Sequence, residues 1–244
     1  MIYSKNAYRV PRRYILTTLW FSRHYLCPVN FLSHYHFDHQ KDNPEYNLGL
    51  IFPDLLRNFV RGSKLKLGSK EPSEKQAKQL HLGCVEHVAS DKIFHAWEGF
   101  HEGMADITRM IRTEDIGIRK DWFIAHILFE LTMDYYLINR NGSLASNLYT
   151  DFGQVDTKTM QHFLELHDFD NFDKFMNGFN RFMEVQYLES YTRSESIVFA
   201  LGKICTKMKL EPFTEKQKFF LNDVVIKLNE KMPTWVERLE VELT

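Results

Sequence analysis

Three polar residues in the middle of the chain are spaced so that a helix would place them on one face. His87, Asp91 and His95 follow one another at four-residue steps, and such positions line a single seam of an α-helix. Imidazole nitrogens and carboxylate oxygens are common ligands of divalent metal ions, so two or three of these side chains could bind one ion. A solvated seam with an Asp–His pair is the alternative that the spacing leaves open.

A second seam of this kind lies in a segment that is apolar on almost every side. Residues 120–138 have the composition of a central buried helix. Within them His126, Glu130 and Asp134 again follow at four-residue steps. Polar groups in such a helix need partners, because burying them unpaired is costly. The periodicity favours a core histidine bonded to Glu130, and a metal ligand is the alternative.

Further candidates lie nearer the beginning of the chain. His34, His36 and a third histidine cluster there, but His34 and His36 cannot share a helical face, so we expect at most one of them to be a ligand. Asp54 follows Pro53 inside an apolar run. Capping of a helix that restarts at the proline is the ordinary explanation, and cation binding is the other. Histidines and aspartates from separate helices, with little cysteine, favour Mn²⁺, Mg²⁺ or Fe²⁺ over structural zinc.

The elements expected to position these residues are helices. Twenty Phe and eleven Tyr stand against seven Pro and eleven Gly, which favours long buried elements over a turn-rich sandwich. With no hairpin signal, the sequence predicts an all-α, single-domain helical bundle. The expected helices are 30–39, 46–60 restarting at Pro53, 73–111 with Ser73 as N-cap and either unbroken or broken near Gly99 and Gly103, 120–138 ending at Asn141-Gly142, 156–167, 171–187, 190–208 and 214–242.

Composition excludes several classes of partner. The net charge of −1 gives no overall electrostatic field that would attract nucleic acid or a membrane surface, and no segment reaches the roughly 18 uninterrupted apolar residues of a membrane-spanning helix.

The cysteines bear on the compartment. Cys27, Cys84 and Cys205 lack CxxC spacing, which fits a reducing compartment. We therefore expect a cytoplasmic protein.

Five short motifs keep their order and rough spacing between residues 30 and 179. They are Asn30-Phe31-Leu32-Ser33-His34, Gly49 with Asp54 and Gly62, Gly83 with His87 and Asp91, Ala125-His126-Ile127-Leu128, and Asn177-Gly178-Phe179. In these motifs the chain resembles the acyl carrier protein phosphodiesterases, distant relatives of the HD-type phosphohydrolases.

The resemblance implies an HD-domain-like helical fold and a metal-dependent hydrolase that releases 4′-phosphopantetheine from holo acyl carrier protein. The residues that it carries over as metal ligands or their partners are His34, Asp54, His87, Asp91 and His126. Mn²⁺ is the first expectation, followed by Mg²⁺ or Fe²⁺. Such an ion would activate water and polarise a phosphoryl oxygen, and His95 or His126 would protonate the leaving serine oxygen as the catalytic acid.

At five positions the chain departs from the family pattern. Leu50 stands in place of an asparagine, Val88 of an arginine, Phe94-His95 of a threonine–aspartate pair and Ala125 of an acidic residue. Loss of a carboxylate that orients a metal ligand lowers affinity or activity roughly 10- to 100-fold. The alternatives are therefore a hydrolase of another phosphoester, such as a nucleotide, and a catalytically impaired relative that acts as a binding protein.

A basic segment follows Asp54. Residues 57–78 hold seven Lys and Arg against two Glu. Because a carrier protein is acidic around its modified serine, a basic surface could steer it, and the alternative is an ordinary solvated loop. The candidate partner-binding residues are Arg57, Arg61, Lys64 and Lys66.

The first residues of the chain are interpreted as an extension. The family's start methionine falls at Val29, so we expect a helical domain over residues 29–244 preceded by a flexible or non-native extension at 1–28. Those residues look superficially like a signal peptide, but Arg23 and His24 interrupt the apolar patch and no small-residue cleavage site follows. We expect no export.

Overall fold

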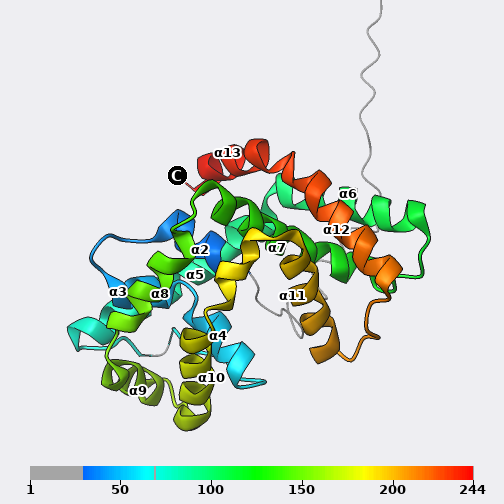
Figure 1. The fold of residues 1–244 in the computed structure, drawn as a ribbon. Coiled ribbons are helices and arrows are strands. Elements are labelled where there is room, and N and C mark those ends of the chain that lie inside the picture. The colour runs from blue at the N-terminus through cyan, green and yellow to red at the C-terminus, as the bar shows by residue number, and fades with distance from the viewer. Residues whose placement is uncertain (1–29, 69, 244) are drawn as a thin grey trace, which may run out of the picture.

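The computed structural model describes residues 30–68 and 70–243, and all regular elements within these ranges are helical (Figure 1). The prediction of an all-α, single-domain bundle is confirmed. The elements are α2 (Phe31–Asp38), α3 (Pro44–Gly49), α4 (Phe52–Phe59), α5 (Lys75–Ala96), α6 (Glu98–Glu114), α7 (Asp121–Arg140), α8 (Leu144–Gln154), α9 (Thr157–Leu166), α10 (Phe172–Val185), the 3₁₀ helix η1 (Tyr187–Thr192), α11 (Ser194–Lys207), α12 (Glu215–Asn229) and α13 (Met232–Leu243). The expectations for residues 1–28 lie outside the described residues.

Helix α7 is the centre of the bundle, as its apolar sequence predicted. It contacts α2, α6, α8, α11, α12, α13 and η1, and Figure 1 shows it running between them. Side chains such as Leu128, Phe129 and Leu131 are completely buried, and burial of each stabilises the fold by about 1.5–3 kcal/mol. The polar residues of α7 are therefore held in a rigid, largely dry environment.

The long helical pattern after residue 73 is broken at Trp97. Trp97 is extended, with φ −67° and ψ 135°, and separates α5 from α6. Its ring lies over Gly99, where an added Cβ would come 2.2 Å from the ring. Of the two expected break points, Gly99 marks the break and Gly103 does not, because α6 continues through Gly103 to admit the ring of Phe129.

Two helix predictions were wrong, and one helix was missed. Helix α5 begins after Glu74 without a side-chain cap, so Ser73 is not its N-cap. The pattern at 214–242 is two helices, because α13 restarts with Pro233 in its first turn. Helix α8 was not expected, although Leu144, Leu148 and Phe152 of its buried face follow at four-residue steps. The Asn141-Gly142 stop signal ends α7 but does not prevent a new helix from starting two residues later.

Helices α3 and α5 cross in direct backbone contact at two glycines. A Cβ on Gly83 would lie 2.1 Å from the carbonyl oxygen of Tyr46, and one on Gly49 would lie 2.4 Å from that of Leu80. The two glycine Cα positions thus approach more closely than side chains would permit. This contact brings the end of α3 against the part of α5 that carries His87.

We expect Gly83→Ala to destabilise the fold and to disturb that crossing. The new methyl group meets backbone atoms, which cannot rotate away, so the free energy of unfolding should fall by about 1–3 kcal/mol or more. Gly142→Ala is the matched control, because nothing lies within 4 Å of its added Cβ. Thermal unfolding of the two variants measures the difference; an unchanged midpoint for Gly83→Ala would contradict the close contact.

No helix among the described residues is both long enough and apolar enough to cross a lipid bilayer.

Candidate metal centre

Two groups of potential metal ligands lie along α5, one on each side of Asp91. The first group is His34, Asp54 and His87, and the second is His95, His126 and Glu130. Within each group, one ligand atom per residue lies within 4.8 Å of the others. The predicted seam of His87 and His95 therefore exists, but its two histidines belong to different groups.

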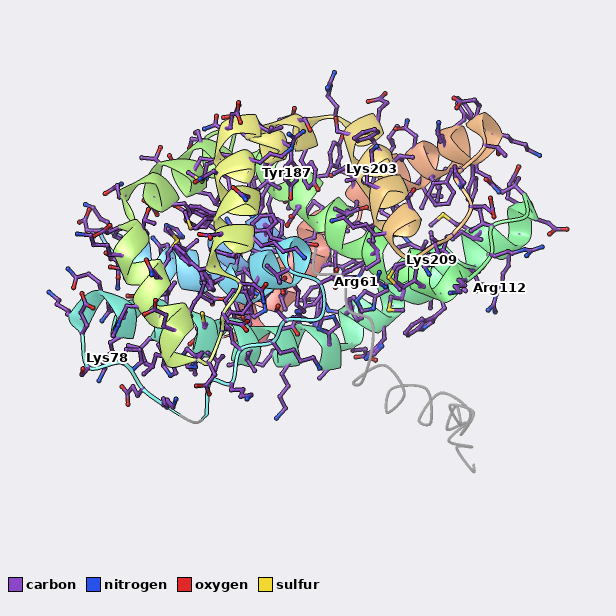
Figure 2. The ribbon with its side chains drawn as sticks, turned by 90° about the horizontal axis from the view of Figure 1, so that it is seen from below. Arg61, Lys78, Arg112, Tyr187, Lys203 and Lys209 are labelled. Atoms are coloured by element: carbon purple, nitrogen blue, oxygen red, sulfur yellow. The ribbon has the colours of Figure 1, made fainter. Side chains whose placement is uncertain are left out.

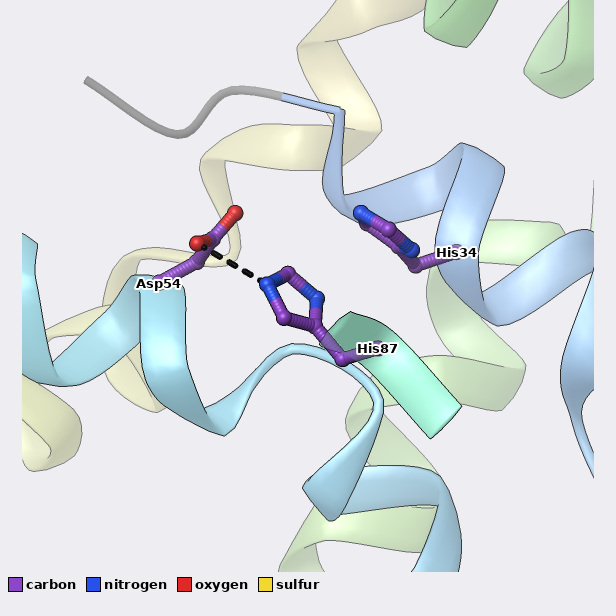
Figure 3. A group of neighbouring side chains, drawn as sticks. All are labelled: His34, Asp54 and His87. Atoms are coloured by element: carbon purple, nitrogen blue, oxygen red, sulfur yellow. Dashed lines mark ion pairs between the residues drawn. The ribbon is translucent and has the colours of Figure 1, made fainter. Parts of the chain in front are cut away.

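The first group is assembled from α2, α4 and α5 (Figure 3). All three side chains are buried. His87 Nε2 lies 3.3 Å from Asp54 Oδ1, and the centroids of the His34 and His87 rings are 4.3 Å apart. Figure 3 shows the His87 ring facing the Asp54 carboxylate, with the His34 ring next to it. Three donors from three separate helices thus converge on one buried point.

A backbone carbonyl at the end of α3 orients His87. The distance from His87 Nδ1 to the oxygen of Leu50 is 2.8 Å; the nitrogen donates this bond, which leaves Nε2 facing Asp54. A ring nitrogen held in this way is the usual arrangement for a histidine that binds a metal through its other nitrogen. Burial alone would lower the pKa of His87, but the neighbouring Asp54 outweighs it and the pKa is raised.

His34 contributes a ring that is neutral at physiological pH. Burial, with a smaller effect from the neighbouring His87, lowers the pKa of His34 to about 3. Its Nδ1 lies 3.3 Å from Ser90 Oγ, whereas its Nε2 is buried without a hydrogen-bond partner among the described residues. An unpaired nitrogen in the core is costly unless it has an unseen partner, and a metal ion would be such a partner.

Asp134 fixes the helix that carries His34. Its Oδ1 accepts hydrogen bonds from the Ser33 backbone N–H at 2.8 Å and the Ser33 hydroxyl at 2.7 Å, and its Oδ2 accepts from the Leu32 N–H at 3.2 Å. These donors belong to the first turn of α2, whose N–H groups have no partner inside the helix. A side chain of the central helix therefore caps α2 from a distance.

The capping explanation for Asp54 is wrong. No side-chain bond caps α4, whose N-cap is Ile51. The Asp54 carboxylate instead pairs with His87 and, through Oδ1, with Arg57 at 3.1 Å. Its side chain is only 3% exposed. Pro53 lies in the first turn of α4, and the Asp54 carboxylate makes its contacts with the buried group instead of capping the helix.

The second group joins α5 to α7. His95 Nε2 lies 3.3 Å from both His126 Nε2 and Glu130 Oε1, and His126 Nε2 lies 2.9 Å from the same Glu130 oxygen. The sequence indicated Glu130 only as a partner of His126, which it is, and did not indicate it as a potential ligand. Its four-residue spacing from His126 on an apolar helix was the signal that could have identified it.

Asp91 lies between the two groups but belongs to neither group of three. Its Oδ1 is 3.2 Å from His95 Nδ1. Burial would raise the pKa of Asp91, yet the bond to His95 and the charges of His95 and His87 hold it well below its usual range. Asp91 is therefore the electrostatic link between the groups.

In the second group, the neighbouring carboxylates favour the protonated, positively charged form of His95. Burial alone would lower the pKa of His95, but Asp91 and Glu130 raise it to about 11. Burial would likewise raise the pKa of Glu130, and His126 and His95 lower it instead. The Glu130 carboxylate and two imidazoles thus favour a cation, either a proton or a metal ion, at their common point.

Other predicted residues lie apart from these groups. Of the N-terminal histidines that the structure describes, His34 belongs to a group of potential ligands and His36 and His39 do not; His36 packs against Phe37 and His39 is exposed. Among the residues departing from the family pattern, the side chains of Leu50 and Ala125 are buried in the apolar core, and Val88 is exposed.

The basic segment does not form one continuous patch. Arg57 is paired with Asp54, and Lys70 and Lys78 are paired with acidic neighbours. Arg61, Lys64 and Lys66 are exposed. Figure 2 shows Arg61 near the middle of one face and Lys78 at its margin. Arg57 therefore lies beside the first group of potential ligands, and the candidate partner surface reduces to the other three.

Comparison of the chain with protein-family models, with curated proteins and with solved structures found no match. A function for the chain must therefore be argued from its residues and their geometry.

Proposed function

We propose that the chain is a metal-dependent phosphodiester hydrolase whose ion is held by His34, Asp54 and His87. The observation that supports this most directly is the unpartnered, buried Nε2 of His34 beside a His87–Asp54 pair. A site that contained only protein would leave this nitrogen unsatisfied, whereas a divalent ion would complete it.

The donor set fits a hard-to-borderline ion. Two imidazole nitrogens and a carboxylate, without a thiolate, suit Mn²⁺, Fe²⁺ or Zn²⁺, and three protein ligands leave coordination positions open to substrate. Of these ions we propose Mn²⁺, which agrees with the resemblance to the acyl carrier protein phosphodiesterases. When bound, the ion supplies a Lewis acid for a phosphoryl oxygen and lowers the pKa of water.

The chain's own residues supply positioning. The carbonyl of Leu50 orients His87, Ser90 contacts His34, and Arg57 holds the Asp54 carboxylate. In the hydrolysis a bond forms between water oxygen and phosphorus, the bond from phosphorus to the serine oxygen breaks, and a proton passes to that oxygen. His95 and His126 are the proposed proton donors if they hold a proton rather than a second ion.

The substrate that we propose is holo acyl carrier protein, with 4′-phosphopantetheine as the released group. Support comes from the family motifs and from Arg61, Lys64 and Lys66, which follow directly after the helix of Asp54 and are exposed. The non-catalytic alternative is favoured by Ala125, which packs in the core where the family has an acidic residue.

The intact mass of holo acyl carrier protein after incubation with the chain and Mn²⁺ tests the proposed reaction. We expect conversion to the apo form, abolished by EDTA and by Asp54→Ala. Asp223→Asn, which changes a partly exposed aspartate on α12 paired with Lys227, is the control and should retain activity. Metal binding without conversion would point to another phosphoester; neither binding nor conversion would favour the binding protein.

Reversing Arg61, Lys64 and Lys66 to Glu should raise KM for the carrier protein at least tenfold and flatten its dependence on salt. Charges at the rim of an interface act mainly on encounter, and screening by salt removes their effect. The matched control reverses the exposed lysines Lys203, Lys207 and Lys216 on α11 and α12. Equal KM values for the two triple variants would remove this surface from the proposal.

A further inference from the structure

We propose that His95, His126 and Glu130 bind a second divalent transition-metal ion, so that α5 contributes ligands to two metal sites. The binding of this second ion is argued from these three residues alone. A role for the ion in phosphoester hydrolysis rests on the function proposed above.

The spacing of the three donor atoms suits one ion. Metal–ligand distances of roughly 2.0–2.2 Å place neighbouring ligand atoms about 2.9–3.5 Å apart in octahedral or tetrahedral sites. The observed separations among His95 Nε2, His126 Nε2 and Glu130 Oε1 are 2.9–3.3 Å. The side chains therefore need little rearrangement to receive a cation.

The orientation of His95 repeats that of His87, eight residues earlier on the same helix. His95 Nδ1 lies 2.8 Å from the carbonyl oxygen of Asp91, as His87 Nδ1 lies 2.8 Å from that of Leu50. In each case the backbone accepts the Nδ1 proton and the Nε2 faces a buried carboxylate. Fixing of the outer nitrogen is characteristic of metal-binding histidines.

Among the described residues, the carboxylate of Glu130 has no lysine or arginine as counter-ion. Its ion pairs there are with His95 and His126, and its side chain is only 4% exposed. Phe100 packs edge-on against both imidazole rings. A buried glutamate enclosed by imidazoles and an aromatic ring requires a positive charge at this position.

The site is accessible from one side. The His95 side chain is 23% exposed, whereas its partners are buried, so an ion can enter past His95 and retain open coordination positions. Asp91 contacts the outer nitrogen of His95, Nδ1, and acts electrostatically on His34 and His87. It therefore orients the His95 ring without being a ligand of the second ion. A second ion with open coordination positions would supply a further Lewis acid for a phosphoryl oxygen.

Metal content of the full chain tests the proposal without any assay of activity. After removal of metal with a chelator, the chain is titrated calorimetrically with Mn²⁺ and with Zn²⁺, and bound metal is counted by mass spectrometry. We expect two ions per chain, one in Glu130→Gln, one in Asp54→Asn and none in the double variant. Circular dichroism should show the same helix content in all of them, since both single changes preserve side-chain volume.

The outcomes separate this inference from the proposed reaction. One ion in the wild type, retained in Glu130→Gln, would overturn the second site and return His95 and His126 to the role of proton donors. Two ions with no cleavage of holo acyl carrier protein would support the second site and refute the substrate. The control Glu189→Gln, an exposed residue of η1, should bind two.

Discussion

Replacing Asp134 by alanine is expected to lower the free energy of unfolding by about 3–5 kcal/mol. The change leaves the backbone N–H groups of Leu32 and Ser33 and the Ser33 hydroxyl without their acceptor, and each unsatisfied buried donor costs about 1–3 kcal/mol. Asp223→Ala, on α12, should change stability by less than about 0.5 kcal/mol. Chemical denaturation of the two variants, without metal, gives the comparison.

The same variant should also weaken the first group of ligands. His34 follows directly after the two capped residues, so loss of the cap loosens the turn that places its ring. We expect Mn²⁺ affinity at His34, Asp54 and His87 to fall at least tenfold in Asp134→Ala, while the second group is retained. A destabilised protein with unchanged affinity at both groups would show that Asp134 supports the fold but not the site.

The pH dependence of stability provides an independent check on Asp134. Burial, opposed by the bonds from Ser33 and Leu32, raises the pKa of Asp134 from 3.8 to about 7. The folded chain therefore binds this proton more tightly than the unfolded chain, and its contribution to stability falls as pH rises from about 4 to 7. Asp134→Asn should lose that component of the slope.

The sequence was sufficient to predict most of the helices but not the contacts between them. Periodicity identified α7 as the buried centre and Pro53 as a restart, because both are local properties. The cap on α2 could not be foreseen, since Asp134 lies 101 residues from Ser33. The sequence shows Gly49 and Gly83 but does not predict that α3 and α5 cross there, because that contact depends on tertiary packing.

The sequence predicted only part of the candidate site, again because contacts between helices are not visible in it. Four-residue spacing put His87, Asp91 and His95 on one seam, but spacing within a helix cannot show which residues of other helices face each position. The structure separates His87 from His95 by giving them different partners. It also adds Glu130, whose role depends on the approach of α5 to α7.

Metal affinity is expected to rise steeply with pH between about 6 and 8. In the metal-free chain the pKa of His87 is raised by Asp54, and that of His95 is raised to about 11 by Asp91 and Glu130, each against the lowering effect of burial. Each ion must displace one of these protons, so each affinity should increase up to about tenfold per pH unit. His34, with a pKa of about 3, is already neutral and contributes no proton.

Calorimetry in buffers of different ionisation enthalpy counts the released protons directly. We expect about two protons per wild-type chain on saturation with Mn²⁺ at about pH 7, and about one in Glu130→Gln, where only the first group binds. The sign follows from linkage: below the pKa of a ligand the proton competes with the ion, and above it the competition ends. Affinities independent of pH would mean that both histidines are neutral before metal binds, which would contradict the buried carboxylate–imidazole pairs on which both sites depend.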